Sequence, residues 1–378
     1  MKNVILLVPT LETGGQERVA VNTADILSDT YNVTFVVFDS RNKSYSPRCG
    51  VVSLNVPASS NRLMKAVNVL RRARALRKIK KQTGCDCCYS FGTTANYANC
   101  LAGGPGKRIV SLHGYRVATF GRAAQFLYRR SDLIICVSGM IKSVVDSNYP
   151  FLKDKTSVLY NPYDFDAMYR MASDSVDDCE FEVPTVISHG RLQPVKNYQC
   201  LIKAFGLASA GRACKLVIIG EGDERPYLES LIEKYGLKDK ASLIGYRDNP
   251  FKYLARASVY VLSSFNEGFP NSLIEGMAFL PVIATDCKSG PREILSDRGD
   301  EKIEGVTISD HGVLIEDVRV RDRDQQINAD DETLAAAIGM LLDDGALAAE
   351  MRKKAKERAG VFSYDLYKKE LAERLERL

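Results

Sequence analysis

Residues 259–276 read VYVLSSFNEGFPNSLIEG, and the rest of the chain is organised around this stretch. Residues 259–262 form a continuous apolar run of the kind that makes a buried strand. Residues 263–270 are typical of a loop, and a helix is expected to begin at Asn271. The stretch therefore predicts a strand, a loop and a helix in direct succession.

The helix that begins at Asn271 offers a place for a phosphate group. The first backbone N–H groups of a helix, here at Asn271, Ser272 and Leu273, have no partner within it and lie at the positive end of its dipole. Glu267 in the loop and Glu275 about one turn inside the helix could accept hydrogen bonds from hydroxyls on both sides of a sugar nucleotide's diphosphate. Taken alone, such a pair is more often a solvated loop charge and an exposed helix charge.

The segment EGFPNSLIE closely resembles the E-x7-E signature of the family 4 glycosyltransferases, and the strand before it and the GMA after it fit the same family. These are retaining enzymes of the GT-B fold. The resemblance therefore implies an α/β chain of two Rossmann-like domains, with parallel sheets, that face a central cleft.

The composition is that of a globular protein large enough for two domains. Of the 378 residues, 45% are hydrophobic and 26% are charged, and no apolar run approaches the length that spans a bilayer. The opening MKNVILLVPTL is interpreted as a first strand, because no small-residue cleavage site of a signal peptide follows it. The ten cysteines are expected to be free and buried, and Cys85, Cys87 and Cys88 are too closely spaced for the usual zinc pattern. We expect no metal site and no cofactor.

A β-α-β rhythm in both halves of the chain predicts parallel sheets. We predict an N-terminal domain over residues 1–160 and a C-terminal domain over residues 184–361. Residues 165–183 are acidic and weakly apolar, and are interpreted as an interdomain linker. Residues 319–331 are interpreted as a charged insertion. The resemblance implies that the N-terminal domain binds the acceptor and that a last helix, about 362–378, crosses back onto it.

The turn LETGGQER follows the first expected strand and contains Gly14 and Gly15. Glycines at this point let a ligand approach the backbone, although a tight turn alone would explain them equally well. The pattern GGxER also resembles the first loop of the glycosyltransferase family. The resemblance assigns Gly15 to the donor and Gly14 to the acceptor.

Residues 62–81, RLMKAVNVLRRARALRKIKK, predict a basic amphipathic helix. Its apolar stripe is expected to consist of Leu63, Val67, Leu70, Ala73, Leu76 and Ile79. One interpretation is a docked helix with a solvated basic face. The other is contact with anionic lipid head groups or a polyprenyl diphosphate, for which the predicted ligands are Arg71, Arg72, Arg74, Arg77 and Lys78. Nucleic acid is not expected as a partner, because no recognition motif or aromatic platform accompanies the charge.

His113 ends the strand-like segment RIVSLHG, and ligands bind outside the carboxyl ends of strands in parallel sheets. A histidine there serves equally well to satisfy loop backbone. The family places a histidine at this strand end near the transferred sugar, so the resemblance implies a catalytic role for His113. Ser138, in CVSGMIK, matches the family's VS-x-x-x-K element and is assigned to the acceptor.

The segment GRLQPVKN contains Gly190, Arg191 and Lys196. An arginine fork and a lysine charge suit a diphosphate that gains negative charge as its bond to the sugar breaks. As isolated residues they would more often be surface charges, but the segment strongly resembles the family's donor-diphosphate clamp. The resemblance also places Gly222, in the loop IGEGD, beside the donor and Tyr246 near the nucleotide base.

Together these residues predict a metal-independent, retaining glycosyltransferase. In this hypothesis Glu275 binds the ribose hydroxyls and Glu267 binds the hydroxyls of the sugar. Arg191 and Lys196 stabilise the leaving diphosphate, which can then take the acceptor proton itself; the family resemblance implies this front-face route. By analogy we expect a UDP-linked hexose or N-acetylhexosamine as the donor.

The segments GGQERV and SFGTTANYAN, with the basic helix, resemble the subset of the family that extends polyprenyl-diphosphate-linked oligosaccharides, such as the N-acetylgalactosaminyltransferases of bacterial N-glycosylation. This implies a lipid-linked glycan acceptor in surface polysaccharide or glycoprotein glycan assembly. It also implies a cytoplasmic enzyme held at the anionic inner face of the cell membrane. The alternatives are a soluble acceptor, a sugar-nucleotide epimerase of the same fold that converts a donor alone, or a scaffold with a degenerate cleft.

Overall fold

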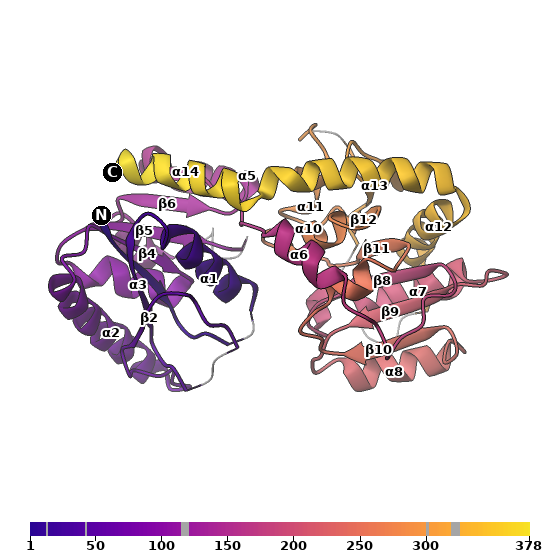
Figure 1. Ribbon diagram of the computed structural model, residues 1–378, viewed down its shortest axis with the longest axis horizontal. Coiled ribbons are helices and arrows are strands. Elements are labelled where there is room, and N and C mark those ends of the chain that lie inside the picture. Colours follow the sequence, from indigo (N-terminus) through magenta and orange to yellow (C-terminus); the bar gives the residue numbers. More distant parts are fainter. Residues whose placement is uncertain (13, 42–43, 115–120, 300–301, 319–325) are drawn as a thin grey trace. The chain divides into compact units, whose positions relative to one another are not determined.

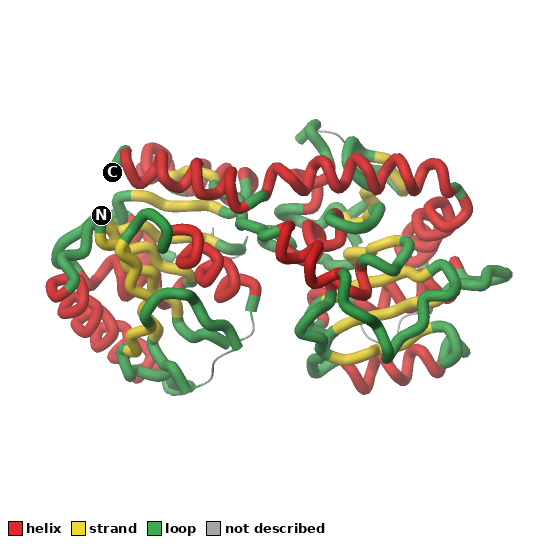
Figure 2. Tube along the Cα trace, viewed as in Figure 1, coloured by secondary structure: helices red, strands yellow, loops and turns green. Residues whose placement is uncertain are grey.

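The computed structural model describes residues 1–12, 14–41, 44–114, 121–299, 302–318 and 326–378. The chain forms two compact units: an N-terminal unit, Met1–Tyr163 with Phe362–Leu378, and a C-terminal unit, Asp164–Val361. Each unit is a sheet covered by helices, as Figure 2 shows. The expected two domains with parallel sheets are confirmed. Part of the predicted insertion at 319–331 lies outside the described residues.

The described strands of the N-terminal unit lie in the order β3-β2-β1-β4-β5-β6-β7, and every neighbouring pair is parallel. The strands are β1 (Asn3–Val8), β2 (Asn32–Val37), β3 (Val51–Ser53), β4 (Cys87–Phe91), β5 (Lys107–Leu112), β6 (Leu133–Cys136) and β7 (Thr156–Val158). The helices are α1 (Gly15–Leu27), α2 (Arg62–Gln82), α3 (Thr93–Ala102), α4 (Arg122–Tyr128), α5 (Gly139–Asn148), η2 (Pro150–Lys155) and α14 (Tyr364–Glu376). Figure 1 labels most of these elements.

Alternation of side chains along β1 builds one apolar layer on each face of this sheet. Leu6 packs in the layer that includes residues of α1 and α14, whereas Leu7 packs in the layer that includes residues of α2 and α3. Strands that are covered on both faces are continuous apolar runs, which explains the segment NVILLV. A buried hydrogen bond of 2.8 Å between Thr23 Oγ1 and Tyr367 Oη ties α14 to α1.

The described strands of the C-terminal unit lie in the order β10-β9-β8-β11-β12-β14-β13, with β13 antiparallel to β14. The strands are β8 (Thr185–His189), β9 (Lys215–Ile219), β10 (Ala241–Gly245), β11 (Val259–Leu262), β12 (Val282–Thr285), β13 (Val306–Ile308) and β14 (Val313–Ile315). The helices are α6 (Phe165–Ala172), η3 (Pro194–Lys196), α7 (Tyr198–Ala208), α8 (Arg225–Lys234), α9 (Phe251–Leu254), α10 (Asn271–Met277), α11 (Pro291–Leu295), α12 (Ala329–Asp343) and α13 (Gly345–Ala359). A last short helix, η4 (Gly360–Phe362), begins in this unit and ends at the first residue of the segment that belongs to the N-terminal unit.

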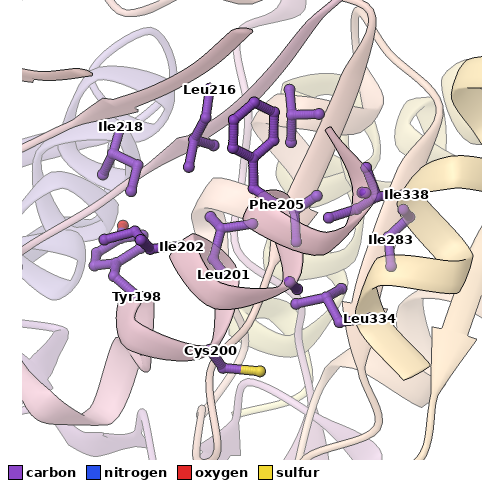
Figure 3. Close-up of a cluster of buried hydrophobic side chains, with 14 of the residues drawn as sticks. Tyr198, Cys200, Leu201, Ile202, Phe205, Leu216, Ile218, Ile283, Leu334 and Ile338 are labelled. Carbon is purple, nitrogen blue, oxygen red and sulfur yellow. The ribbon is translucent and has the colours of Figure 1, made fainter. Parts of the chain in front are cut away.

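The core of the C-terminal unit lies where α7 and α12 cover the sheet. In Figure 3 the side chains of Phe205 from α7, Leu216 from β9 and Ile338 from α12 gather in one buried cluster. The strand order reverses between β8 and β11, and in parallel sheets ligands bind at such a reversal, outside the carboxyl ends of the strands. The expected strand at 259–262 and the helix start at Asn271 are confirmed as β11 and α10.

The segment interpreted as an interdomain linker is instead part of the C-terminal unit. Within it, α6 is helical, and Asn249 Nδ2 donates to the Met171 carbonyl at 2.7 Å. Asp178 forms an ion pair of 2.7 Å with Arg247. The acidic composition suggested a solvated linker, but Asp178 and Glu180 pair with Arg247 and Lys215, and the linear sequence does not reveal these partners.

No disulfide joins any two of the ten cysteines, and eight of them are buried. Cys87 points to the apolar layer opposite to that of Cys85 and Cys88, so the three closely spaced cysteines do not share one face of the sheet. Burial raises the pKa of Cys85 to about 12, which keeps this thiol protonated at neutral pH. Within the described ranges, no three His, Cys, Asp or Glu side chains gather as a metal site would require, and no helix combines the length and apolarity needed to cross a membrane.

Candidate active site

The backbones of the loops after β8 and β9 are in direct contact, because glycines at the contact points have no side chain. Gly190 directly follows β8 at φ +151°, and a Cβ there would lie 3.1 Å from Tyr198 Oη. A Cβ on Gly220 would lie 1.9 Å from the Gly190 carbonyl oxygen, and one on Gly222 would lie 2.3 Å from the Leu192 carbonyl oxygen. Gly220 and Gly222 therefore let the loop after β9 approach the backbone of the loop after β8, which contains Gly190.

Lys196 and Glu267 join the loop after β8 to the loop after β11. Lys196 Nζ lies 2.7 Å from Glu267 Oε1, and the two side chains are only 17% and 13% exposed. Ser264 Oγ donates to the same carboxylate oxygen at 2.6 Å, and Ser263 Oγ donates to the Lys196 carbonyl at 2.9 Å. The structure thus brings together the two residues that were predicted for the diphosphate and for the sugar.

Glu275 is buried, not exposed, and its partner is a residue that the sequence analysis did not single out. Glu275 Oε2 lies 2.5 Å from His189 Nε2, with the residues 3% and 9% exposed. The His189 ring also packs against Tyr260, with ring centroids 5.5 Å apart. The signal available in the sequence was a polar residue at the end of the apolar strand TVISH, directly before Gly190.

Arg191, the other predicted cation of the clamp, is arranged differently from Lys196. It is exposed, and its guanidinium has no hydrogen-bond or ion-pair partner among the described residues. Lys196 is held by Glu267, so the loop after β8 presents one engaged and one available positive charge. Such a pair suits a ligand that carries more than one negative charge.

The start of α10 fits the predicted phosphate site only in part. Asn271 is partly exposed, whereas Ser272 and Leu273 are buried. The backbone N–H of Leu273 donates at 3.1 Å to the carbonyl of Pro270, the residue before the helix, so this amide already has a hydrogen-bond partner at the predicted phosphate site. The reason is a tight first turn, which satisfies this amide locally.

Tyr246, predicted to lie near the base, is 53% exposed at the end of β10. Its carbonyl accepts a hydrogen bond of 3.0 Å from Arg247 Nη1, and Arg247 Nε also contacts Asp178 at 2.9 Å. The residues around Tyr246 are therefore fixed through Arg247, while the ring itself is open to solvent.

The glycine turn and His113 belong to the N-terminal unit. Gly14 precedes α1, its carbonyl accepts from Arg18 N at 3.0 Å, and a Cβ on Gly14 would lie 2.1 Å from Glu17 Oε2. Gly15 is the exposed first residue of α1. His113 Nε2 lies 2.9 Å from Ser111 Oγ, and burial lowers the pKa of His113 to about 4. At neutral pH this imidazole is therefore uncharged, and it can act as a hydrogen-bond partner but not as a cation.

Ser138 does not fit its predicted place beside the acceptor. Its side chain is fully buried, and Oγ accepts a hydrogen bond of 3.2 Å from Ile141 N. This is the geometry of a helix cap, here for α5. The hydroxyl therefore stabilises the helix start, and burial keeps it from a ligand at the surface.

The predicted apolar stripe of α2 is split between two faces of the helix. Ala73 and Leu76 are buried, but Leu63, Val67 and Leu70 are 79%, 40% and 49% exposed. Steps of three residues fall short of a full turn of 3.6, so a stripe built mainly of such steps winds around the helix. Only its C-terminal part packs on the sheet.

The solvent-facing side of α2, called here the outer face, carries both apolar and basic residues. Its apolar part consists of Leu63, Met64, Val67 and Leu70. Its basic part consists of Arg71, Arg74, Arg77 and Lys78. All eight are exposed, and the four cations have no ion-pair partner among the described residues.

Arg72 does not belong to this surface, although it was predicted with the other basic residues. It is 5% exposed, and its guanidinium donates to the Val56 carbonyl at 3.0 Å and the Pro57 carbonyl at 2.9 Å. The same group stacks on Phe38 at 4.0 Å from the ring centroid, and burial lowers its pKa from the ordinary value. Arg72 therefore fastens α2 to the chain beneath it.

Comparison with known families and proteins agrees with this arrangement. Residues 180–358 match the family model described as "Glycosyl transferases group 1", and residues 13–167 match the one described as "Glycosyltransferase Family 4". A curated relative from Campylobacter jejuni, named "N-acetylgalactosamine-N,N'-diacetylbacillosaminyl-diphospho-undecaprenol 4-alpha-N-acetylgalactosaminyltransferase", is 27% identical over 96% of this chain and 96% of its own length. A second relative from the same organism, an α-1,4-N-acetyl-D-galactosaminyltransferase of a diphospho-undecaprenol-linked glycan, is 26% identical over 98% and 97%.

Solved structures share the whole fold at low identity. Anabaena HepE, in a crystal structure with UDP, superimposes with a TM-score of 0.77 at 18% identity and covers 100% of both chains. A glycosyltransferase from Rickettsia africae gives a TM-score of 0.78 at 17% identity, covering 100% of this chain and 98% of its own. At these identities the likeness concerns the fold alone.

Proposed function

This chain is a family 4 glycosyltransferase of the GT-B fold, and we propose that it transfers a hexose or N-acetylhexosamine, with retention, from a UDP-sugar to a polyprenyl-diphosphate-linked glycan. The observation that carries the proposal is the Lys196–Glu267 pair, which joins the loops after β8 and β11 where the strand order reverses. One edge of the C-terminal sheet therefore carries four predicted donor residues: Lys196, Glu267, the exposed Arg191 and the buried Glu275.

Arg191 and Lys196 supply positive charge to the diphosphate. As the bond from the sugar to the diphosphate breaks, negative charge grows on the diphosphate oxygens, and fixed cations stabilise this charge more than they stabilise the intact donor. The leaving diphosphate then accepts the proton of the attacking hydroxyl on the same face of the sugar. This route accounts for retention and requires neither a metal ion nor a protein nucleophile.

Glu267 has two roles in this proposal. Without a donor it neutralises Lys196 across a distance of 2.7 Å. With a donor bound, Lys196 turns to the diphosphate and the carboxylate accepts hydrogen bonds from hydroxyls of the sugar. Glu275 accepts from the ribose, and the uncharged His113 of the N-terminal unit contacts the transferred sugar or the acceptor hydroxyl.

For the base and the acceptor, the named relatives supply the support. HepE was crystallised with UDP, and the two Campylobacter relatives are named for diphospho-undecaprenol-linked acceptors. The outer face of α2 suits such a substrate, because its basic part can bind anionic head groups or a diphosphate beside an apolar part that enters the lipid. We infer an enzyme held at the cytoplasmic face of the cell membrane.

Release of nucleoside diphosphate tests the proposed reaction. A panel of nucleotide sugars is incubated with the protein, with and without polyprenyl-diphosphate-glycan and vesicles. Release that requires one donor and the lipid-linked acceptor supports the proposal, whereas donor isomerisation or release without any acceptor indicates an epimerase or a hydrolase. Lys196→Ala should abolish most transfer, and Lys238→Ala, which removes an exposed ion pair with Glu233, should not. Transfer by Lys196→Ala close to the wild-type rate would refute the clamp.

Sedimentation with phosphatidylglycerol vesicles tests the membrane contact. Replacing the four basic residues of the outer face, Arg71, Arg74, Arg77 and Lys78, by Gln should abolish vesicle binding. The double substitution Leu63→Ser and Leu70→Ser should weaken it. A control with the same loss of charge replaces four other exposed lysines: Lys234, Lys238, Lys353 and Lys369. Unchanged vesicle binding and turnover in the first variant would contradict the assignment.

A further inference from the structure

The contact of His189 with Glu275 has no place in the signature or in the roles given above. His189 ends β8, and Glu275 lies in α10, the helix that follows β11. The strand order of the sheet reverses between β8 and β11. We propose that His189 is a positioning residue for the nucleoside, because it holds the Glu275 carboxylate in the orientation that accepts hydrogen bonds from the ribose. The inference rests on the proposed function, in which Glu275 binds the ribose.

The contact between His189 and Glu275 is short and buried. His189 Nε2 and Glu275 Oε2 are 2.5 Å apart, and the residues are 9% and 3% exposed. A carboxylate that accepts from the ribose has to be ionised, and the proposal therefore places the proton of this contact on Nε2 as the donor. Burial by itself favours the neutral form of a carboxyl group. The neutral form carries an O–H that donates a hydrogen bond, whereas the ribose hydroxyls need an acceptor. The imidazole N–H opposes this effect of burial by stabilising the ionised form.

Both partners are fixed by the same aromatic ring. The His189 ring meets Tyr260 at an interplanar angle of 66° with centroids 5.5 Å apart. A Cβ on Gly276, the residue after Glu275, would lie 2.5 Å from Tyr260 Cγ, so α10 rests directly on that ring. Tyr260 therefore sets the distance between the helix that carries the carboxylate and the imidazole that orients it.

The role predicted for His189 concerns binding and not bond breaking. His189 is followed directly by Gly190 and Arg191. One short segment therefore contains both the histidine that orients Glu275 and the arginine proposed to bind the diphosphate. Loss of the imidazole N–H leaves the diphosphate contacts in place and disturbs only the ribose contact. A hydrogen bond to a charged group corresponds to roughly a tenfold change in affinity or more. We expect the donor KM to rise about tenfold with kcat unchanged.

Three variants isolate the effect. His189→Leu removes the donor, and His189→Gln retains an N–H that can reach the carboxylate. His311→Leu is the matched control, because His311 Nε2 contacts the Asp297 carboxylate at 3.0 Å in the same unit. If leucine at 189 prevents folding, His189→Asn replaces it, since its shorter amide ends near the place of Nδ1 and cannot reach Glu275.

Titration calorimetry with UDP, 2′-deoxy-UDP and 3′-deoxy-UDP provides the test, with the corresponding guanosine series in parallel. The wild-type protein, the Gln variant and the His311 control should bind UDP about tenfold more tightly than at least one deoxy compound. The Leu variant should discriminate less than about threefold. If the Leu variant weakens all three ligands equally or keeps full discrimination, His189 only packs and the inference is overturned. If the wild-type protein binds neither UDP nor GDP, the proposed function fails instead.

Discussion

Replacing Glu267 by Gln should tighten the binding of UDP and at the same time slow sugar transfer. In the resting protein Lys196 is engaged by Glu267 at 2.7 Å, and both side chains are largely buried. A diphosphate must therefore compete with Glu267 for the ammonium group. Gln keeps the shape of the side chain but removes this competing charge, so Lys196 becomes available to the ligand. The hydroxyls of the sugar then lose a charged acceptor.

The magnitude follows from the change in one hydrogen bond. A charge-assisted hydrogen bond is roughly twice as strong as a neutral one and contributes about 1.5–3 kcal/mol. Halving the bond to Lys196 releases about 0.8–1.5 kcal/mol for the diphosphate, which corresponds to about four- to twelvefold tighter UDP. The reverse change, Lys196→Met, removes the cation and should weaken UDP by about tenfold or more. Transfer should fall by about 10²-fold in either variant.

Titration with UDP separates the two effects, because UDP carries the diphosphate without the sugar that Glu267 binds. Turnover is then measured by release of UDP from the active donor. Lys238→Met serves as the control, since it breaks an exposed lysine–glutamate pair in the same unit. If Glu267→Gln weakens UDP as Lys196→Met does, or if it leaves UDP affinity unchanged, the competition inferred from the ion pair does not exist.

Three further predictions concern stability. Arg72→Ala should lower the free energy of unfolding by about 2–3 kcal/mol in urea titrations, because it removes two buried hydrogen bonds and the stacking on Phe38, while the folded fraction still binds vesicles. Gly220→Ala should cost about 3 kcal/mol or more, since its Cβ would lie 1.9 Å from a carbonyl oxygen; Gly345→Ala, with open space around it, should be neutral or slightly stabilising. The pKa of His113 is about 4 in the folded chain, below its ordinary value of 6.5, so the unfolded chain binds more protons between these values. Stability should therefore fall by on the order of 2–3 kcal/mol as the pH drops from 6.5 to 4, and His113→Asn should remove this dependence.

Much of the fold follows from local patterns that the structure confirms. The strand at 259–262 was predicted from its apolar run, and the helix start at Asn271 was predicted from the loop pattern that precedes it. Lys196 and Glu267 were assigned from the sequence to one donor site, and this predicts that the two residues lie near each other. Their direct contact across 71 positions of sequence could not be predicted, since it depends on how the two loops fold after their strands.

The errors have a common physical origin, which is that composition does not show partners. Arg72 and the acids near Asp178 look like solvated charges in the sequence, yet both find acceptors or cations in the folded unit. Ser138 matched a family element and proved to be a buried helix cap. His189 was missed because its function depends on a carboxylate 86 positions away.

The outer face of α2 is exposed to solvent, and the free energies expected for its side chains support the proposed membrane contact. The four apolar side chains together expose about as much as two whole side chains, whose burial in lipid would contribute about 3–6 kcal/mol. The four cations, which have no ion-pair partner among the described residues, add about 1 kcal/mol each at an anionic surface. Each part alone is comparable to a single acyl chain, which binds membranes only marginally, whereas the two together suffice for reversible attachment. Such attachment can position the enzyme beside a lipid-linked acceptor and still allow it to release the membrane after transfer.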